Sequence, residues 1–266
     1  MVQKFTNLIL IHTHKITSRV HYTLEFVFKK VLNTDFKVTD DLEEYKQFNG
    51  AKINYSHEDL NEGIFIKPTE LLFENRIEEK QIFVTQWDSL KIFFQTNDDS
   101  ALPFDIFAAI FYLVSRYEEH LPFLADTHGR FEAKESLAYD NNFLQDPIVD
   151  QWIYAFADII QEKYPDVSFQ KREFKFISTI DIDNAYAFLF KGISRTLGAT
   201  LRSLINLDLE ENIRRYRTLA GKKDPYDTYD IFFDIHQKYN IKPIWFFLVG
   251  NSGRFDKNVS VEKTAY

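Results

Sequence analysis

An apolar run that ends on two acidic residues lies in the second half of this sequence: Phe176-Ile177-Ser178-Thr179-Ile180-Asp181-Ile182-Asp183-Asn184. Its apolar character predicts a strand over residues 174–183 that is buried on both faces, as is typical of the parallel sheets of α/β proteins. In such sheets the reactive groups follow the carboxyl ends of the strands. Two carboxylates at this point suit a divalent cation, a general base, or both.

A second buried strand is predicted over residues 241–250, which read Ile-Lys-Pro-Ile-Trp-Phe-Phe-Leu-Val-Gly. Between the two strands, residues 193–220 have helical patterns. Asp224-Pro225-Tyr226-Asp227-Thr228 supplies turn and cap residues for a helix over residues 229–239. The order strand, helix, strand predicts a right-handed parallel crossover. We therefore expect residues 171–266 to begin an α/β or barrel fold.

Residues 1–170 are expected to form a separate α/β accessory domain, joined to the second domain at the polar residues 170–173. The hydrophobic periodicity predicts strands at 7–12, 52–55, 63–67, 81–87 and 90–95, with a hairpin connection at 87–90, and helices at 17–33, 40–48, 104–119 and 147–163.

The composition excludes several classes of protein. There are 27 Phe and 14 Tyr but only 8 Gly and 7 Pro, which indicates long regular elements rather than a disordered chain. The formal charge of −8 argues against wholesale binding to nucleic acid or to an anionic membrane. The absence of Cys excludes disulfides and thiolate metal sites. No apolar run is long enough to cross a bilayer, so we expect no transmembrane segment and a cytoplasmic location.

Residues 191–223 differ from this acidic average, because they contain eight basic and three acidic residues. Such a run could meet an anionic glycan or a membrane surface. We expect the more common arrangement, a solvated helix face that balances an acidic neighbouring domain.

The pair Asp181 and Asp183 admits several interpretations. One acid could cap the following helix while the other is solvated. A phosphotransferase of the haloacid-dehalogenase type also ends its first strand in Asp-x-Asp, but usually has Thr two residues after the second Asp, where this chain has Ala185. A nucleotide-sugar glycosyltransferase uses Asp-x-Asp to hold a metal against a diphosphate, but this sequence has no phosphate-cradling glycine loop.

Two runs can be compared with a known family: Thr179-Ile180-Asp181-Ile182-Asp183 and Ile241-Lys242-Pro243-Ile244-Trp245-Phe246-Phe247-Leu248-Val249-Gly250. They resemble the first motif and the second strand of the NodB-type polysaccharide deacetylases, in which that strand is commonly Ala-Thr-Phe-Phe-Val-Val-Gly. Leu102-Pro103-Phe104-Asp105-Ile106-Phe107 and Ser115-Arg116-Tyr117-Glu118-Glu119 resemble the uncharacterised domain that precedes such a deacetylase domain in a group of bacterial proteins. The resemblance spans most of the chain.

The resemblance implies a role for each acid. Asp181 would be the general base that activates a water, and Asp183 would be a ligand of a divalent metal, of which zinc is the expected one. Ile182 separates the two acids, where the common motif has adjacent acids followed by Gly. The family takes two further metal ligands from a His-x-x-x-His pair and its general acid from a later His, but no histidine follows His236. We therefore expect a barrel truncated after its second strand and little activity from these 266 residues alone, as a fragment or as a protein that has lost its activity.

The existing histidines are not expected to replace those ligands. His12 and His14 alternate at the end of the first predicted strand, where we expect polar edge residues rather than a metal site. His120 and His128 are expected at the surface, and His236 on the solvent face of its helix. None has the i, i+4 spacing of helical zinc ligands.

The function implied for the complete protein is metal-dependent hydrolysis of N- or O-acetyl groups on a carbohydrate polymer or cell-envelope glycan. Two alternatives stay open: a non-catalytic glycan-binding or scaffold protein with a degenerate deacetylase barrel, and an Asp-x-Asp phosphotransferase.

Overall fold

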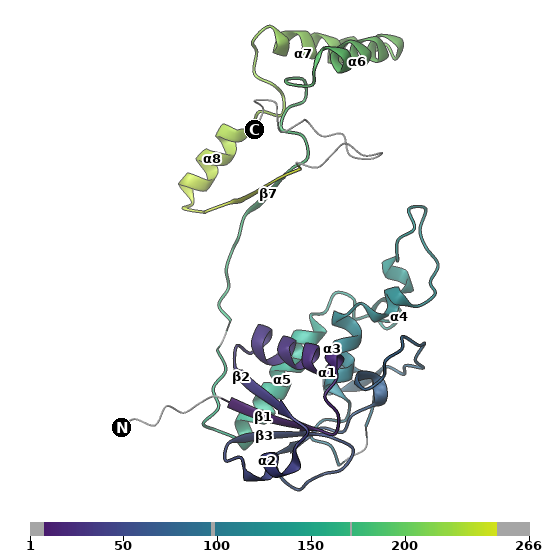
Figure 1. Ribbon diagram of the computed structural model, residues 1–266. Helices are drawn as coiled ribbons and strands as arrows, with labels where there is room; N and C mark the ends of the chain where they lie inside the picture. The colour runs from purple at the N-terminus through teal and green to yellow at the C-terminus, as the bar shows by residue number, and fades with distance from the viewer. Residues whose placement is uncertain (1–7, 97–98, 171, 249–266) are drawn as a thin grey trace. The chain divides into compact units, whose positions relative to one another are not determined.

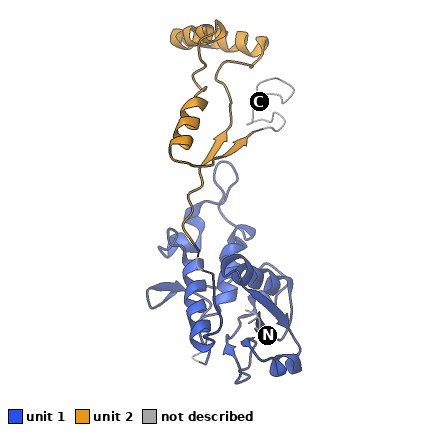
Figure 2. Cartoon of the chain, turned by 90° about the vertical axis from the view of Figure 1, so that its left-hand side faces the viewer, with its two compact units in different colours: residues 1–172 blue, residues 173–266 orange. Residues whose placement is uncertain are grey.

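A computed structural model describes residues 8–96, 99–170 and 172–248 of the chain. Two units can be distinguished, Met1–Arg172 (unit 1) and Glu173–Tyr266 (unit 2), shown in different colours in Figure 2. The division falls within the polar segment of residues 170–173. Each unit contains helices and parallel strands, so the fold is mixed α/β.

Unit 1 is built on a four-stranded parallel sheet in the order β2-β1-β3-β4 (Figure 1). The strands are β1 (Leu8–Thr13), β2 (Asp35–Thr39), β3 (Ala51–Tyr55) and β4 (Ile64–Phe65). In the register, Ile9 pairs with Phe36 on one side and with Ala51 on the other. Every residue of β1 after Leu8 is buried, as expected for a central strand that is covered on both faces.

Helices cover the two faces of this sheet (Figure 1). One face packs against α1 (Ser18–Leu24), its π-helical continuation η1 (Glu25–Val31), α3 (Ile106–Val114) and α5 (Ile148–Lys163). The short helix α2 (Leu42–Gln47) contacts the other face through the fully buried Tyr45.

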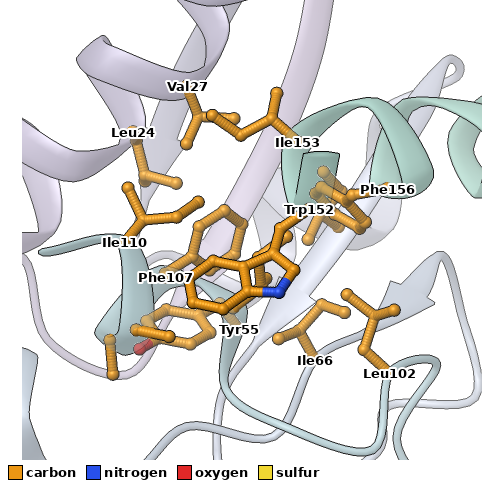
Figure 3. Close-up of a cluster of buried hydrophobic side chains, with 14 of the residues drawn as sticks. Leu24, Val27, Tyr55, Ile66, Leu102, Phe107, Ile110, Trp152, Ile153 and Phe156 are labelled. Carbon is orange, nitrogen blue, oxygen red and sulfur yellow. The ribbon is translucent and has the colours of Figure 1, made fainter. Parts of the chain in front are cut away.

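Aromatic residues fill the larger core, between the sheet and α3 and α5 (Figure 3). The ring of Phe107 lies edge-on to Tyr55 of β3, with the centroids 5.0 Å apart, and to Phe156 of α5, at 5.7 Å. Trp152 is fully buried, and its indole N–H donates a hydrogen bond of 2.9 Å to the carbonyl of Lys91. This bond satisfies the one polar group of the indole inside an apolar core.

The remaining elements of unit 1 are short. The strands β5 (Thr85–Trp87) and β6 (Leu90–Ile92) form the predicted hairpin, and Asp88 in its turn has a φ of 50°, in the left-handed region. Three 3₁₀ turns, η2 (Glu70–Leu72), η3 (Tyr117–His120) and η4 (Ala133–Glu135), and the helix α4 (Leu137–Asp140) complete the unit.

Several predictions for unit 1 were incomplete. The helix expected over residues 104–119 is α-helical only over Ile106–Val114, and the strands expected at 81–87 and 90–95 are observed as Thr85–Trp87 and Leu90–Ile92. The helix expected over residues 17–33 is α-helical only as far as Leu24 and then widens into the π-helical η1. The strand β2 was not predicted at all. Only Phe36 and Val38 alternate with polar residues in its five positions, so the pattern is too short to separate a strand from a loop.

Unit 2 contains β7 (Thr179–Ile182), α6 (Ile193–Ile205), α7 (Leu209–Leu219), α8 (Tyr229–Lys238) and β8 (Ile244–Phe247). The two strands pair in parallel, with Asp181 opposite Phe246. Helices α6 and α7 lie side by side (Figure 1) and form what we call the α6–α7 hairpin, residues 193–219. Across the described part of both units, none of the helices combines the length and the apolarity needed to cross a membrane.

The strands of unit 2 are shorter and more exposed than predicted. β7 covers four residues of the expected 174–183, and Phe174 and Phe176 before it are 93% and 66% exposed. β8 ends at Phe247, and of the strand expected over residues 241–250, Val249 and Gly250 lie outside the described residues. The prediction of burial on both faces was wrong because a two-stranded sheet that packs against one helix leaves most of its surface in solvent.

Candidate active site

The two acids singled out in the sequence lie at the carboxyl end of β7. Asp181 is the third residue of the strand, which ends at Ile182, and the backbone bends at Asp183. Both side chains are exposed, and neither carboxylate has a hydrogen-bond or ion-pair partner within the described residues. The next residue, Asn184, accepts a hydrogen bond of 2.9 Å from the ammonium group of Lys191. The carboxylates are therefore free to accept a proton or a cation.

A buried carboxylate fixes the segment that follows these acids. Asp224 is 2% exposed and accepts hydrogen bonds from the backbone N–H groups of Ala187, Phe188 and Leu189, at 2.8, 2.9 and 3.1 Å. A fourth bond comes from the N–H of Tyr226, at 2.9 Å. Burial alone would raise the pKa of Asp224, but the four donors outweigh it and the pKa is lowered, so the group stays ionised.

Residues 224–228 were predicted to supply turn and cap residues for the helix over residues 229–239, and this is confirmed: Asp224 accepts from the N–H of Tyr226 in the turn, and Thr228 is the N-cap of α8, although its side chain makes no capping hydrogen bond. The sequence did not predict the second role of Asp224, which is to hold the backbone of residues 187–189. The contact joins positions 36 residues apart, so no local pattern could reveal it.

A serine and a histidine connect β7 to α8. Ser178 Oγ lies 2.8 Å from Nε2 of His236, and Nδ1 of His236 lies 2.6 Å from the carbonyl oxygen of Phe232. A carbonyl can only accept, so Nδ1 carries a proton, and in the neutral form of the ring Nε2 accepts from the serine hydroxyl. The prediction that His236 faces solvent was wrong, because the side chain is 7% exposed and lies against Trp245 of β8.

A serine that donates to a neutral imidazole is also the arrangement of a nucleophile with its base. Ser178 precedes β7, however, whereas reactive groups of parallel sheets gather at the carboxyl ends of the strands. The distance along an extended chain from Ser178 to Asp183 is roughly 16 Å. We therefore assign the Ser178–His236 pair to holding α8 against the strands.

In unit 1 the carboxyl ends of β1 and β3 carry further polar groups, at the point where the strand order reverses direction. His12 was predicted to be a polar edge residue but is 7% exposed, with its ring 5.3 Å from that of Tyr45. Burial lowers the pKa of His12 and outweighs a hydrogen bond to Asn54, which raises the pKa. Its Nδ1 atom has no hydrogen-bond partner within the described residues.

His14 does not join His12 but lies beside His57, which the sequence did not single out. The two imidazole rings are 4.5 Å apart, and the ring of Phe73 is 4.1 Å from that of His14. Nε2 of His57 is 3.6 Å from a carboxylate oxygen of Glu70. Burial, followed by the nearby His57, lowers the pKa of His14, so the His14 imidazole is neutral near neutral pH. The predicted surface positions of His120 and His128 are confirmed.

The described residues do not by themselves form a zinc site. Within them, no group of three or more His, Cys, Asp or Glu side chains is arranged to hold a metal ion. Asp181 and Asp183 supply two carboxylates, whereas catalytic zinc sites use three protein ligands. Asp183 therefore stays a predicted metal ligand, and we derive no reaction step through a metal.

Comparison with known proteins identifies a family for the first unit. Residues 9–165 match the model of DUF7033, which is described as a family of unknown function. The match covers more than half of the chain and ends before β7, so Asp181, Asp183 and Asp224 lie outside it. No curated protein and no solved structure matches the chain.

Proposed function

Because the chain belongs to the DUF7033 family, whose function is unknown, we propose its activity from the residues that follow the matched range. The proposed reaction is hydrolysis of acetyl groups on a carbohydrate polymer or cell-envelope glycan. Asp181 is the proposed general base and Asp183 a proposed ligand of a divalent metal, with zinc as the expected ion.

The observation that supports this proposal is the pair of exposed, unpartnered carboxylates at the carboxyl end of β7. An acid that serves structure is usually paired or buried, as Asp224 is. Asp181 and Asp183 instead remain in solvent, next to a backbone segment that Asp224 holds in place. Such a position suits groups that act on a ligand rather than on the fold.

A barrel is the proposed setting of these acids. β7, α8 and β8 form a parallel strand–helix–strand arrangement, which is the repeating unit of a (β/α) barrel. Apolar side chains on the strands, among them Ile244 and Phe246, are 47% and 52% exposed. Further strands and helices of a barrel would cover them.

The chemistry proposed for Asp181 is proton transfer. Its carboxylate takes a proton from the water that attacks the acetyl carbonyl carbon. The protonated Asp181 then returns that proton to the sugar nitrogen or oxygen as the bond between this atom and the acetyl carbon breaks, which releases acetate and the free amine or hydroxyl. A divalent metal, when bound, would supply polarisation of the carbonyl and of the water. The tether formed by Asp224 fixes the backbone that follows Asp183, which limits the motion of both acids.

The test is acetate release from acetylated chitin oligomers in the presence of Zn²⁺, measured on the product of the whole reading frame that contains these residues. Asp181→Asn is expected to lower the rate by about 10²- to 10⁴-fold, because a positioned base contributes that much. Asp183→Asn is expected to lower both the rate and the zinc content. Asp234→Asn, which removes an exposed acid of α8, is the matched control and should leave the rate unchanged.

Two further assays separate the alternatives. Phosphatase activity that depends on Asp181, without acetate release, would replace the proposal with a phosphotransferase. Glycan binding that is unchanged in both variants, again without acetate release, would replace it with a binding module.

A further inference from the structure

The α6–α7 hairpin has a polar interior. Ser203, Asn212, Arg215 and Thr218 are each buried to more than nine-tenths. Arg215 donates to Asn212 Oδ1 at 2.7 Å and to Thr200 Oγ1 at 3.2 Å, and it also pairs with the Glu211 carboxylate. The expectation of a solvated basic face is therefore wrong for this arginine, which joins the two helices from the inside.

The outer surface of the same hairpin is apolar. Large apolar side chains recur at helical spacing on both helices, and each is at least 48% exposed: Ile193, Leu197, Leu201, Leu204 and Ile205 on α6, and Leu209, Ile213, Tyr216 and Leu219 on α7. A shallow groove of about 540 Å³ lies along α7 between Leu209 and Ala220. Helices in water show the reverse order, with the apolar stripe inside and the polar residues outside. The hairpin is thus arranged for apolar surroundings on its outer face.

Basic residues flank this apolar surface. Lys191, Arg195, Arg202, Arg214, Arg217, Lys222 and Lys223 lie on or beside the hairpin, and all but the half-buried Lys191 are exposed. Residues 191–223 carry a net charge of +5 in a chain whose net charge is −8. Glu210 and Glu211 are paired with arginines of α7, and Lys223 is paired with Asp230. Basic residues still outnumber acidic ones beside the apolar surface, so its edge has a net positive charge.

The charge and the apolar side chains together select one occupant. A second copy of the hairpin would bring like charges together. Single-stranded nucleic acid uses aromatic platforms, whereas this surface is mainly Leu and Ile. An anionic bilayer satisfies both features, because aliphatic side chains enter the acyl boundary while Lys and Arg meet the headgroups.

We propose that the α6–α7 hairpin binds the surface of an anionic lipid bilayer, with its Leu and Ile side chains inserted and its flanking Lys and Arg side chains at the lipid phosphates. The site does not involve Asp181 or Asp183. The proposed membrane binding can therefore be tested independently of the proposed hydrolase activity.

The test is flotation of the full chain with vesicles of phosphatidylcholine alone or with about 30 mol% phosphatidylglycerol. Binding is expected for the anionic vesicles, with release when salt is raised from about 0.1 to 0.5 M. Leu201→Asp is expected to weaken binding about tenfold or more, because a charge replaces an inserted leucine. Arg195→Glu combined with Arg202→Glu is expected to weaken binding at least tenfold through the lost attraction.

Two variants in unit 1 serve as controls. Leu144→Asp changes a side chain that is also 48% exposed, and Lys30→Glu reverses an exposed charge, so both should bind as the unchanged chain does. Circular dichroism identifies any variant that fails to fold. The salt dependence is measured on the unchanged chain, so it tests the proposal even if a variant does not fold.

Three results would overturn the proposal: equal binding to both kinds of vesicle, binding that is unchanged by the hairpin substitutions, or binding to neither kind of vesicle. The last result would indicate that a protein partner covers this surface.

Discussion

At the scale of single residues, two buried aspartates behave in opposite ways. Asp224 receives only backbone N–H donors, and its pKa is lowered. Asp105 is fully buried at the start of α3, and burial raises its pKa to about 6 although four groups donate to it. The donors are the N–H groups of Thr69, at 2.6 Å, and of Ala108, at 3.0 Å, and the hydroxyls of Tyr55 and Thr69. For Asp105 the effect of burial is larger than that of the four donors, so its pKa shift is upward.

Asp105 should make the stability of unit 1 depend on pH. Its folded pKa of about 6 lies above the ordinary value of 3.8, so the folded state keeps a proton that the unfolded state releases. The stabilising contribution is complete below pH 3.8 and is lost as pH rises towards 6, by about 3 kcal/mol in total. Urea unfolding of the unchanged chain and of Asp105→Asn between these pH values measures the difference.

The variant provides the reference, because an amide does not ionise. The lowered pKa values of His12 and His14 change the free energy of unfolding in the opposite direction. The stability that these two neutral histidines contribute is lost as pH falls below their ordinary pKa of 6.5. They act equally in both proteins, so the difference isolates Asp105. Parallel stability curves for the two proteins would contradict the raised pKa.

At the scale of elements, the sequence predicts long helices and strands whose pattern is local in the chain. The helix expected over residues 147–163 is observed as Ile148–Lys163, because four turns of apolar spacing leave no ambiguity. The position of Asp181 and Asp183 at the carboxyl end of a strand was predictable from the apolar run before them. The hydrogen-bond partner of His236 was not predictable, because Ser178 is 58 residues away in the sequence. Which side of a helix is buried also depends on the elements that pack against it.

The link between Ser178 and His236 should stabilise the packing of α8 on the strands. Ser178→Ala leaves Nε2 of a buried histidine without its donor, which we expect to lower the free energy of unfolding of unit 2 by about 1–2 kcal/mol. Hydrogen exchange of the α8 amides measures the change. Ser194→Ala removes an exposed hydroxyl from α6 and should leave α8 exchange unaltered, whereas equal effects of the two substitutions would argue against the link.

At the scale of the whole molecule, charge and family membership divide along the same line. Residues 1–172 contain 18 basic and 28 acidic residues, and residues 173–266 contain 14 and 12, so the net charges are −10 and +2. The DUF7033 match lies within the acidic unit. Composition averaged over the chain suggested a protein that avoids anionic surfaces, but that average hides a basic hairpin in the second unit.

The tether formed by Asp224 also determines how freely the hairpin could be exchanged. Asp224 holds residues 187–189, so the chain segments before and after the hairpin lie side by side. Replacing residues 191–222 by a few glycines is expected to preserve hydrogen-exchange protection of β7, α8 and β8 and to abolish vesicle binding. Loss of that hydrogen-exchange protection would contradict the expectation that the hairpin can be removed without unfolding the rest of unit 2.

If the excision succeeds, the hairpin is a module in the evolutionary sense. Relatives could lengthen it, lose it or acquire a different insert without altering the residues that pair the strands. The surface presented by the hairpin could then diverge while the residues at the end of β7 stayed the same.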